Sequence, residues 1–276
     1  MVVRFVKYEA SGNDYIYVDC RDEKKLKYSS LAKRLSDRHF GIGGDGMVFI
    51  LESNVADCRM RMFNADGSEG KMCGNAVRSV AKYMRDYAQM TGDYIKIETA
   101  SGIKKVGFSD NKFVADMGKV SFFNPHAPQM IASDTKLELN IEGTLFSPSL
   151  VSIGNPHAVI FGEVDNFCKI GSLIEKNPTF NGGINVEFVE VQKDYLDVKV
   201  WERGSGRTLS CGTGACAVTF SSIQKGLCER NKWQKIKMEG GLLEVMINSD
   251  NVAFLRGEVH EIFRGEFESS EYEYEI

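Results

Sequence analysis

Short runs of alternating or continuous apolar residues, separated by glycine, asparagine, aspartate and serine, dominate the first half of the chain. This pattern is typical of β-strands joined by tight turns. It predicts strands over residues 2–8, 15–19, 47–52, 58–63, 94–99, 103–108 and 112–117. A polar stretch between the second and third strands predicts a helix over 29–37, with Ser29 or Ser30 as its N-cap.

A helical period follows Cys73. Apolar residues recur there at intervals of three and four, at Ala76, Val77, Val80, Ala81 and Met84. The pattern predicts a helix that begins at the Cys-Gly-Asn turn of Cys73 and ends near Gly92. Cys211 lies on a similar Cys-Gly-Thr-Gly turn, before a second apolar segment over 215–223.

The second half of the chain repeats the order of the first. A Gly-Asn turn at 154–155 precedes a predicted strand at 158–162, as Gly12-Asn13 precedes the strand at 15–19. Glycine loops at 41–46 and 181–183 precede the strands at 47–52 and 186–191, and a strand at 196–201 corresponds to 58–63. Residues 236–259 align with 97–120 and share a Ser-Asp-Asn turn. Such self-similarity predicts two copies of one α/β unit, at roughly 1–120 and 150–260, with a connector at 121–149.

Composition limits the class of protein. The chain has 276 residues, of which 43% are hydrophobic and 26% charged, as in ordinary globular proteins. A net charge of −4 gives no support for nucleic-acid binding, and no apolar run reaches the length of a membrane span. The first residues lack the apolar core of a signal peptide, so we expect a cytoplasmic protein with no membrane partner.

Seven cysteines at irregular spacings argue against a disulfide scaffold, and none has the spacing of a zinc site. Neither a phosphate-binding loop nor a dinucleotide fingerprint is present, because the glycines at 41–46 have the wrong spacing. We therefore expect no metal ion. The cysteines outside the two turns are expected to be buried core residues: Cys20, Cys58, Cys168, Cys216 and Cys228.

The two cysteine turns suggest acid–base chemistry. A thiol at a helix N-terminus feels the positive end of the helix dipole, which favours the thiolate, and the free N–H groups there bind carboxylates. Because duplicated halves usually pack about a two-fold axis, we expect Cys73 and Cys211 to face each other over a cleft. One sulfur could then remove a proton from a carbon while the other returns a proton to the opposite face. No lysine lies in a pyridoxal phosphate context, so no cofactor is expected.

Five motifs carry a resemblance to a known family: SGNDY, FNADGSEGKMCGNA, GNPH, GGINVEF and WERGSGRTLSCGTGACA. Over nearly the whole chain and in the same order, they resemble the diaminopimelate epimerase family. The resemblance implies an α+β fold of two pseudo-symmetric domains, each a mostly antiparallel sheet or barrel around a central helix. We expect them at 1–120 and 121–261, with the end of the chain, 262–276, packing back on the first. It also implies a homodimer that interconverts LL- and meso-diaminopimelate without pyridoxal phosphate, on the route to lysine and peptidoglycan.

The resemblance assigns roles to residues of this chain. Cys73 and Cys211 are the paired acid and base. The carboxylate at the reacting carbon is bound by Gly74, Asn75, Gly212 and Thr213. The amino groups and the distal carboxylate are bound by Asn13, Asn64, Asn155, Asn185, Glu202 and Arg203. His157 has two open readings, since it could orient a catalytic group or cap its turn.

Two positions depart from the family pattern. Many members carry glutamine where this chain has Gly46, and glutamate where it has Arg207. Arg207 either alters the field of the cleft or lies on the surface. Both departures are compatible with a racemase of another amino acid, such as histidine. A non-catalytic amino-acid-binding protein and a redox sensor, in which the two cysteines form a reversible disulfide, are the alternatives outside that class.

Overall fold

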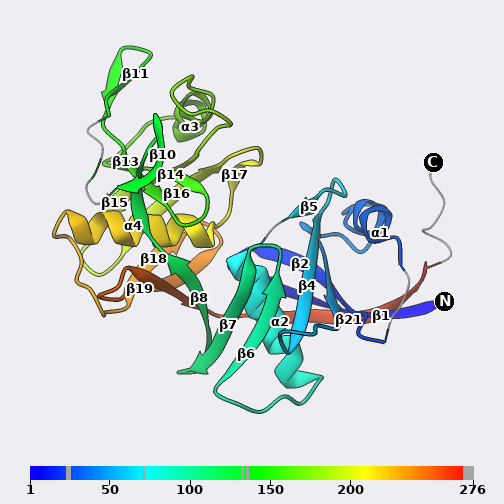
Figure 1. The fold of residues 1–276 in the computed structure, drawn as a ribbon. Coiled ribbons are helices and arrows are strands. Elements are labelled where there is room, and N and C mark those ends of the chain that lie inside the picture. The colour runs from blue at the N-terminus through cyan, green and yellow to red at the C-terminus, as the bar shows by residue number, and fades with distance from the viewer. Residues whose placement is uncertain (23–25, 71, 132–133, 135–136, 270–276) are drawn as a thin grey trace. The chain divides into compact units, whose positions relative to one another are not determined.

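The chain divides into two compact units in the computed structural model, which describes residues 1–22, 26–70, 72–131, 134 and 137–269 (Figure 1). Unit 1 contains Met1–Ala115 and Gly257–Ile276, and unit 2 contains Asp116–Arg256. Residues 270–276, the last part of the segment expected to pack back on the first half, lie outside the described residues. Each unit is described by itself below.

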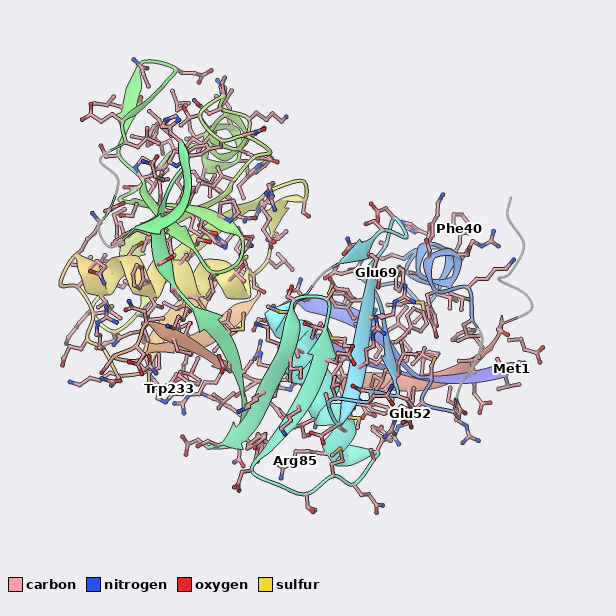
Figure 2. The ribbon with its side chains drawn as sticks, in the orientation of Figure 1. Met1, Phe40, Glu52, Glu69, Arg85 and Trp233 are labelled. Atoms are coloured by element: carbon pink, nitrogen blue, oxygen red, sulfur yellow. The ribbon has the colours of Figure 1, made fainter. Side chains whose placement is uncertain are left out.

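Unit 1 is a mixed sheet with two helices. Its helices are α1 (Tyr28–Leu35) and α2 (Gly74–Asp86). Its strands are β1 (Val2–Ala10), β2 (Asn13–Asp19), β3 (Gly46–Leu51), β4 (Cys58–Asn64), β5 (Glu69–Gly70), β6 (Tyr94–Thr99), β7 (Gly102–Ser109), the first part of β8 (Lys112–Lys119) and β21 (His260–Glu268). The last strand belongs here because β21 pairs antiparallel with β1, and Ser269 N donates to the carbonyl of Met1 (Figure 2) at 2.9 Å.

Unit 2 is built in the same way, with additional strands in its first part. Its helices are α3 (Phe167–Glu175) and α4 (Gly212–Gln224). Its strands are β9 (Ser121–Asn124), β10 (Ala127–Ile131), β11 (Leu139–Ile141), β12 (Thr144–Phe146), β13 (Ser149–Ser152), β14 (Pro156–Phe161), β15 (Asn185–Val191), β16 (Leu196–Glu202), β17 (Gly206–Thr208), β18 (Gln234–Met238), β19 (Gly241–Ile247) and β20 (Val252–Gly257).

The two units share one order of strand pairing. In unit 1, β2 pairs parallel with β3 across the helix α1, and in unit 2, β14 pairs parallel with β15 across α3. A parallel pair needs such a crossover. The second parallel pairs are β4 with β6 and β16 with β18, and the remaining matched pairs are antiparallel. The structure is therefore a duplicated, mostly antiparallel α+β fold.

A central helix is buried in each unit. The predicted apolar face of α2 is confirmed, because Ala76, Val77, Val80, Ala81 and Met84 are all buried. This helix packs on β1, β2, β6 and β7, and α4 packs on β13, β14, β15, β18 and β19. Since α4 is covered nearly all round, it carries apolar or small residues on every side.

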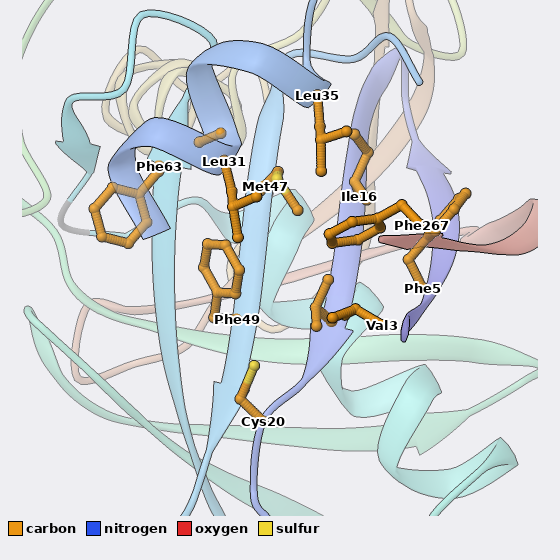
Figure 3. Packing of buried hydrophobic residues seen from close by; sticks show 12 residues of the cluster. Val3, Phe5, Ile16, Cys20, Leu31, Leu35, Met47, Phe49, Phe63 and Phe267 are labelled. Atoms are coloured by element: carbon orange, nitrogen blue, oxygen red, sulfur yellow. The ribbon is translucent and has the colours of Figure 1, made fainter. Parts of the chain in front are cut away.

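A second core lies between α1 and the sheet of unit 1. Figure 3 shows Leu31 and Leu35 of α1 above Met47 and Phe49 of β3. Successive residues of a strand point to opposite faces. On β2, Ile16 therefore belongs to this core, whereas its neighbour Tyr17 interacts with Ser79 of α2 on the other side. The sheet is thus packed on both faces, which holds the strand ends near α2 in fixed positions.

Two predicted helices were wrong at their ends. The helix α1 begins after Lys27, which has no side-chain cap, and Ser29 Oγ donates to the Gly67 carbonyl at 2.7 Å instead of capping. The helix α2 ends at Asp86, well before Gly92. The second central helix begins at Gly212, directly after Cys211, as the matched cysteine turns predict.

The sequence patterns also missed the helix α3 and four short strands in the predicted connector, β9–β12. Among the described residues, no helix is both long and apolar enough to cross a membrane.

Candidate active site

Each of the two singled-out cysteines is the N-cap residue of the central helix in its own unit. Cys73 precedes α2 with φ −129° and ψ 125°, and Cys211 precedes α4 with φ −134° and ψ 112°. The first helical residue is a glycine in both cases, Gly74 and Gly212. The first N–H groups of a helix have no partner inside it, so each thiol lies beside backbone donors that can bind an anion.

Around Cys73, asparagine side chains form a hydrogen-bonded chain. Asn75 Nδ2, in the first turn of α2, donates to Asn13 Oδ1 at 2.5 Å. Asn13 Nδ2 in turn donates to Asp45 Oδ2 at 3.3 Å. Asn75 Oδ1 accepts from the guanidinium of Arg78 at 2.6 Å. The structure therefore brings Asn13 to the start of the helix that Cys73 caps.

Around Cys211, a longer network joins the start of α4 to β14 and the loop before that strand. The sulfur of Cys211 accepts from Gly214 N at 3.3 Å and lies 3.4 Å from Thr213 Oγ1. Asn155 Nδ2 donates to Thr213 Oγ1 at 3.2 Å, and Asn155 Oδ1 lies 3.1 Å from His157 Nε2. Four of the predicted site residues of unit 2 are therefore linked to one another by side-chain contacts.

His157 is fully buried and has a partner on each ring nitrogen. Asn155 Nδ2 donates to Thr213 Oγ1, and the amide oxygen of Asn155 faces His157 Nε2 at 3.1 Å. The other nitrogen, Nδ1, lies 2.7 Å from Glu187 Oε1, and Glu187 is also fully buried. Of the two readings of His157, this geometry supports the orienting one.

Glu187 was missed in the sequence, although a signal was present. It is a charged residue inside the apolar strand β15, and Val186 and Phe188 on either side of it are buried. A carboxylate in such a place is normally paired. Its nearness to α4 is clear from Gly214, where an added Cβ would lie 2.6 Å from Glu187 Oε1.

Carboxylates make the environment of Cys211 electronegative. Burial raises the pKa of the Cys211 thiol well above its ordinary value, and the charges of Glu202 and Glu187 raise it further. Hydrogen bonds from Thr213 and Gly214 to the sulfur lower this pKa but do not offset burial. Burial likewise raises the pKa of Glu202, which accepts from Thr208 Oγ1 at 2.6 Å. At neutral pH the sulfur of Cys211 is therefore a protonated thiol.

We expect Glu202→Gln to lower the titration midpoint of Cys211 by about one pH unit, because a neighbouring negative charge disfavours the thiolate and the substitution removes it. The midpoint is measured from the 13Cβ shift of labelled cysteine as pH is raised. Glu190→Gln is the matched control, since Glu190 lies on β15 but pairs with Lys199 at 3.5 Å near the surface. If the midpoint in Glu202→Gln stays at the wild-type value or rises, the Glu202 carboxylate does not raise the pKa of Cys211.

The remaining predicted residues lie at strand ends. Asn64 is the exposed last residue of β4, and its Nδ2 donates to Ser68 Oγ at 3.0 Å. Asn185 is buried, with Nδ2 donating to the Pro156 carbonyl at 2.8 Å and Oδ1 accepting from Arg203 N at 3.0 Å. Asn185 thus ties the start of β14 to the loop after β16.

The two departures from the family pattern have structural explanations. At Gly46 an added Cβ would lie 2.0 Å from the Phe63 carbonyl oxygen, so this backbone leaves no room for a side chain. Arg207 Nη2 lies 2.5 Å from Glu239 Oε2, and its side chain is 55% exposed. Arg207 therefore belongs to a surface ion pair. In the part of the chain that the structure describes, no cluster of three or more histidine, cysteine or acidic side chains has the geometry of a metal site.

Comparisons with known proteins point to one family. A family model described as diaminopimelate epimerase matches residues 5–123 and 149–262. The chain is 43% identical over 281 residues to the diaminopimelate epimerase of Acetivibrio thermocellus, covering 98% of this chain and 100% of that protein. It is 41% identical over 278 residues to the diaminopimelate epimerase of Methanococcus maripaludis, covering 96% and 100%.

Solved structures with low sequence identity share the fold. A phenazine biosynthesis protein of the PhzF family from Bacillus anthracis matches with a TM-score of 0.70 at 15% identity, covering 97% of this chain and 99% of that one. A hydroxyproline epimerase from Agrobacterium vitis matches with a TM-score of 0.68 at 13% identity, covering 96% and 91%. Together with the family model, these matches confirm the expected fold class. The chain belongs to the diaminopimelate epimerase family.

Proposed function

We propose that this chain is an isomerase that interconverts LL- and meso-diaminopimelate by proton transfer between Cys73 and Cys211, without a cofactor. The observation that carries the proposal is the duplicated N-cap cysteine, one at the start of each central helix. Relatives at 43% and 41% identity named diaminopimelate epimerase support the choice of substrate.

In one direction the thiolate of Cys73 takes the α-proton and becomes a thiol. The thiol of Cys211 gives its proton to the opposite face of the same carbon and becomes a thiolate. One proton leaves the substrate and one arrives, so the configuration inverts and the charge is unchanged. The reverse direction exchanges the roles of the two sulfurs.

The α-proton of an amino acid is a very weak acid, so negative charge that develops toward the carboxylate must be stabilised. Backbone N–H groups at Gly74, Asn75, Gly212 and Thr213 lie in the first turns of the two helices, where the helix itself supplies no acceptor for them. These N–H groups would bind the substrate carboxylate at the reacting carbon. Because the donors are fixed by the helices, they need no rearrangement during the reaction.

Diaminopimelate has an amino-acid group at each end, so the site must also hold a second ammonium and a second carboxylate. Arg203 offers a fork that suits a carboxylate, and Glu202 an oxygen pair that suits an ammonium. Asn13, Asn64, Asn155 and Asn185 complete the proposed set of anchors. The product of the proposed reaction would feed lysine and peptidoglycan synthesis in the cytoplasm. We also propose that the protein is a homodimer, which light scattering would test.

The proposal is tested by α-hydrogen exchange in deuterated water, followed by mass spectrometry and chiral separation. The purified protein is offered LL-diaminopimelate, L-histidine, L-lysine and L-glutamate under reducing conditions. We expect one deuterium to enter diaminopimelate, with inversion at the exchanged carbon, and none to enter the others. Exchange of histidine alone would keep the two-cysteine chemistry and overturn the substrate. Tight binding of diaminopimelate without exchange would identify a binding protein instead.

A further inference from the structure

The side chain of Arg78 is fully buried in unit 1, yet its hydrogen-bond acceptors among the described residues are neutral oxygens. Nη2 donates to Asn75 Oδ1 at 2.6 Å, Nε to the Gly74 carbonyl at 3.3 Å, and Nη1 to the Glu258 carbonyl at 3.5 Å. None of the ion pairs within the described part of the chain includes Arg78. A cation is therefore held away from water by three uncharged oxygens.

The position of Arg78 on the helix explains these contacts and adds to their cost. Side chains of a helix lean toward its N-terminus, so Arg78 reaches back over the preceding turn to Gly74 and Asn75. The N-terminal end of a helix already carries positive partial charge, which disfavours a cation there. Burial without a carboxylate partner disfavours it further. A nearby anion would offset the cost of burying this cation.

Among the described residues, the titratable groups whose negative charge would raise the pKa of Arg78 are Cys73, Tyr17 of β2 and Glu9 of β1. Burial raises the pKa of Tyr17 far above its ordinary value, so its phenol stays neutral. Glu9 accepts from Gly12 N at 3.1 Å and lies 3.9 Å from His260 of β21, so other donors share its charge. Cys73 remains as the group whose ionisation would compensate the buried cation.

The Arg78 side chain is positively charged at neutral pH. Burial lowers the pKa of Arg78 to about 10, which still leaves the guanidinium protonated. The equivalent position on α4, five residues after Cys211, is Cys216, which is buried and carries no positive charge. The two cysteines thus have opposite surroundings, a guanidinium near Cys73 and the carboxylates Glu202 and Glu187 near Cys211.

We propose that Arg78 is a positioning residue of the reaction, which fixes the Asn75–Asn13 pair and keeps Cys73 in the thiolate form by its buried charge. This inference rests on the proposed function, in which the Cys73 thiolate is the base of one direction. It gives the resting protein a defined state, with the thiolate on Cys73 and the proton on Cys211. Two thiols in identical surroundings would have no such preference.

The test is the pH profile of Cys73 alkylation by iodoacetamide, read from the modified peptide by mass spectrometry in the absence of substrate. In Arg78→Gln we expect the midpoint to rise by about one pH unit or more, since loss of a nearby opposite charge disfavours the thiolate. Arg78→Lys keeps the charge but cannot form the three hydrogen bonds. Its midpoint should stay near wild type, while kcat/KM falls about tenfold through misplacement of Asn75.

Arg85→Gln is the matched control. Arg85 lies in the last turn of α2, where it stacks 4.7 Å from the ring centroid of Phe108 on β7 (Figure 2). It is about 16 Å along the helix from the first turn, so its removal should leave the alkylation profile unchanged. A folded Arg78→Gln protein with the wild-type profile overturns the inference.

If Arg78→Gln does not fold, Arg78→Lys alone tests both proposed roles of Arg78. Wild-type kcat/KM in that variant would show that the guanidinium hydrogen bonds do not matter, and would overturn the positioning role. A raised alkylation midpoint in that variant would overturn the charge role. Alkylation uses no amino acid, so failure of the wild-type protein to exchange diaminopimelate refutes the proposed function without altering this result.

Discussion

Cys73→Ala and Cys211→Ala are each expected to lower kcat for diaminopimelate epimerisation by about 10³-fold or more. A positioned acid or base contributes roughly 10²–10⁴-fold to a proton-transfer step. In the proposed reaction each sulfur serves one face of the carbon, so neither cysteine can replace the other. The measurement is the initial rate of meso-diaminopimelate formation from the LL form, with circular dichroism to show that each variant is folded.

The double variant gives a stronger test than either single one. If the two cysteines act as one unit, Cys73→Ala/Cys211→Ala should be no slower than the slower single variant, because the second substitution removes nothing that still works. Multiplied losses would mean that the two residues contribute independently, which contradicts a two-base reaction.

Cys216→Ala is the matched control for both cysteine variants. Cys216 is a fully buried cysteine on α4 that packs in the core, outside the proposed site. Its loss should reduce stability slightly and leave kcat within about twofold of wild type. If either site variant behaves like Cys216→Ala, that cysteine is a core residue and the proposed chemistry is wrong.

Local patterns were enough to predict the cysteine turns and the repeat. The apolar spacing after Cys73 reflects the face of α2 that packs on the sheet, and every residue of that predicted face is buried. The repeat was visible because the turn residues recur in the same order, and the two units do share one order of pairing. Both signals lie within a few residues of the features that they predict.

Glu187 and Arg78 could not be recognised in the same way, because their surroundings come from distant parts of the chain. Glu187 meets His157 through the parallel register of β14 and β15, in which His157 lies opposite Asn185. Arg78 lies on no apolar stripe, and part of its cover is the carbonyl of Glu258, 180 positions away. The apolar residues on either side of Glu187 signal its burial, but no sequence pattern shows which residue it contacts or that Arg78 is buried.

Gly46 shows the opposite case, a departure from the family pattern that the backbone explains. Gly46→Ala is expected to lower the free energy of unfolding by about 3 kcal/mol, measured by urea denaturation. The new Cβ would lie 2.0 Å from the Phe63 carbonyl oxygen and 2.9 Å from the ring of Tyr15. Gly46 pairs with Tyr15 on β2 and Asn64 on β4, so neither neighbour can withdraw without breaking a ladder.

The matched control is Gly107→Ala in β7, where the nearest atom to an added Cβ is the Asp93 carbonyl oxygen at 3.3 Å. Its effect should stay within about 1 kcal/mol, because a small shift of that loop relieves the contact. Gly46→Gln, which introduces the residue that many family members carry, should destabilise at least as much as Gly46→Ala. If Gly46→Gln instead folds with wild-type stability, β3 and β4 can separate at this point. The glycine would then reflect the choice of substrate and not the packing of the sheet.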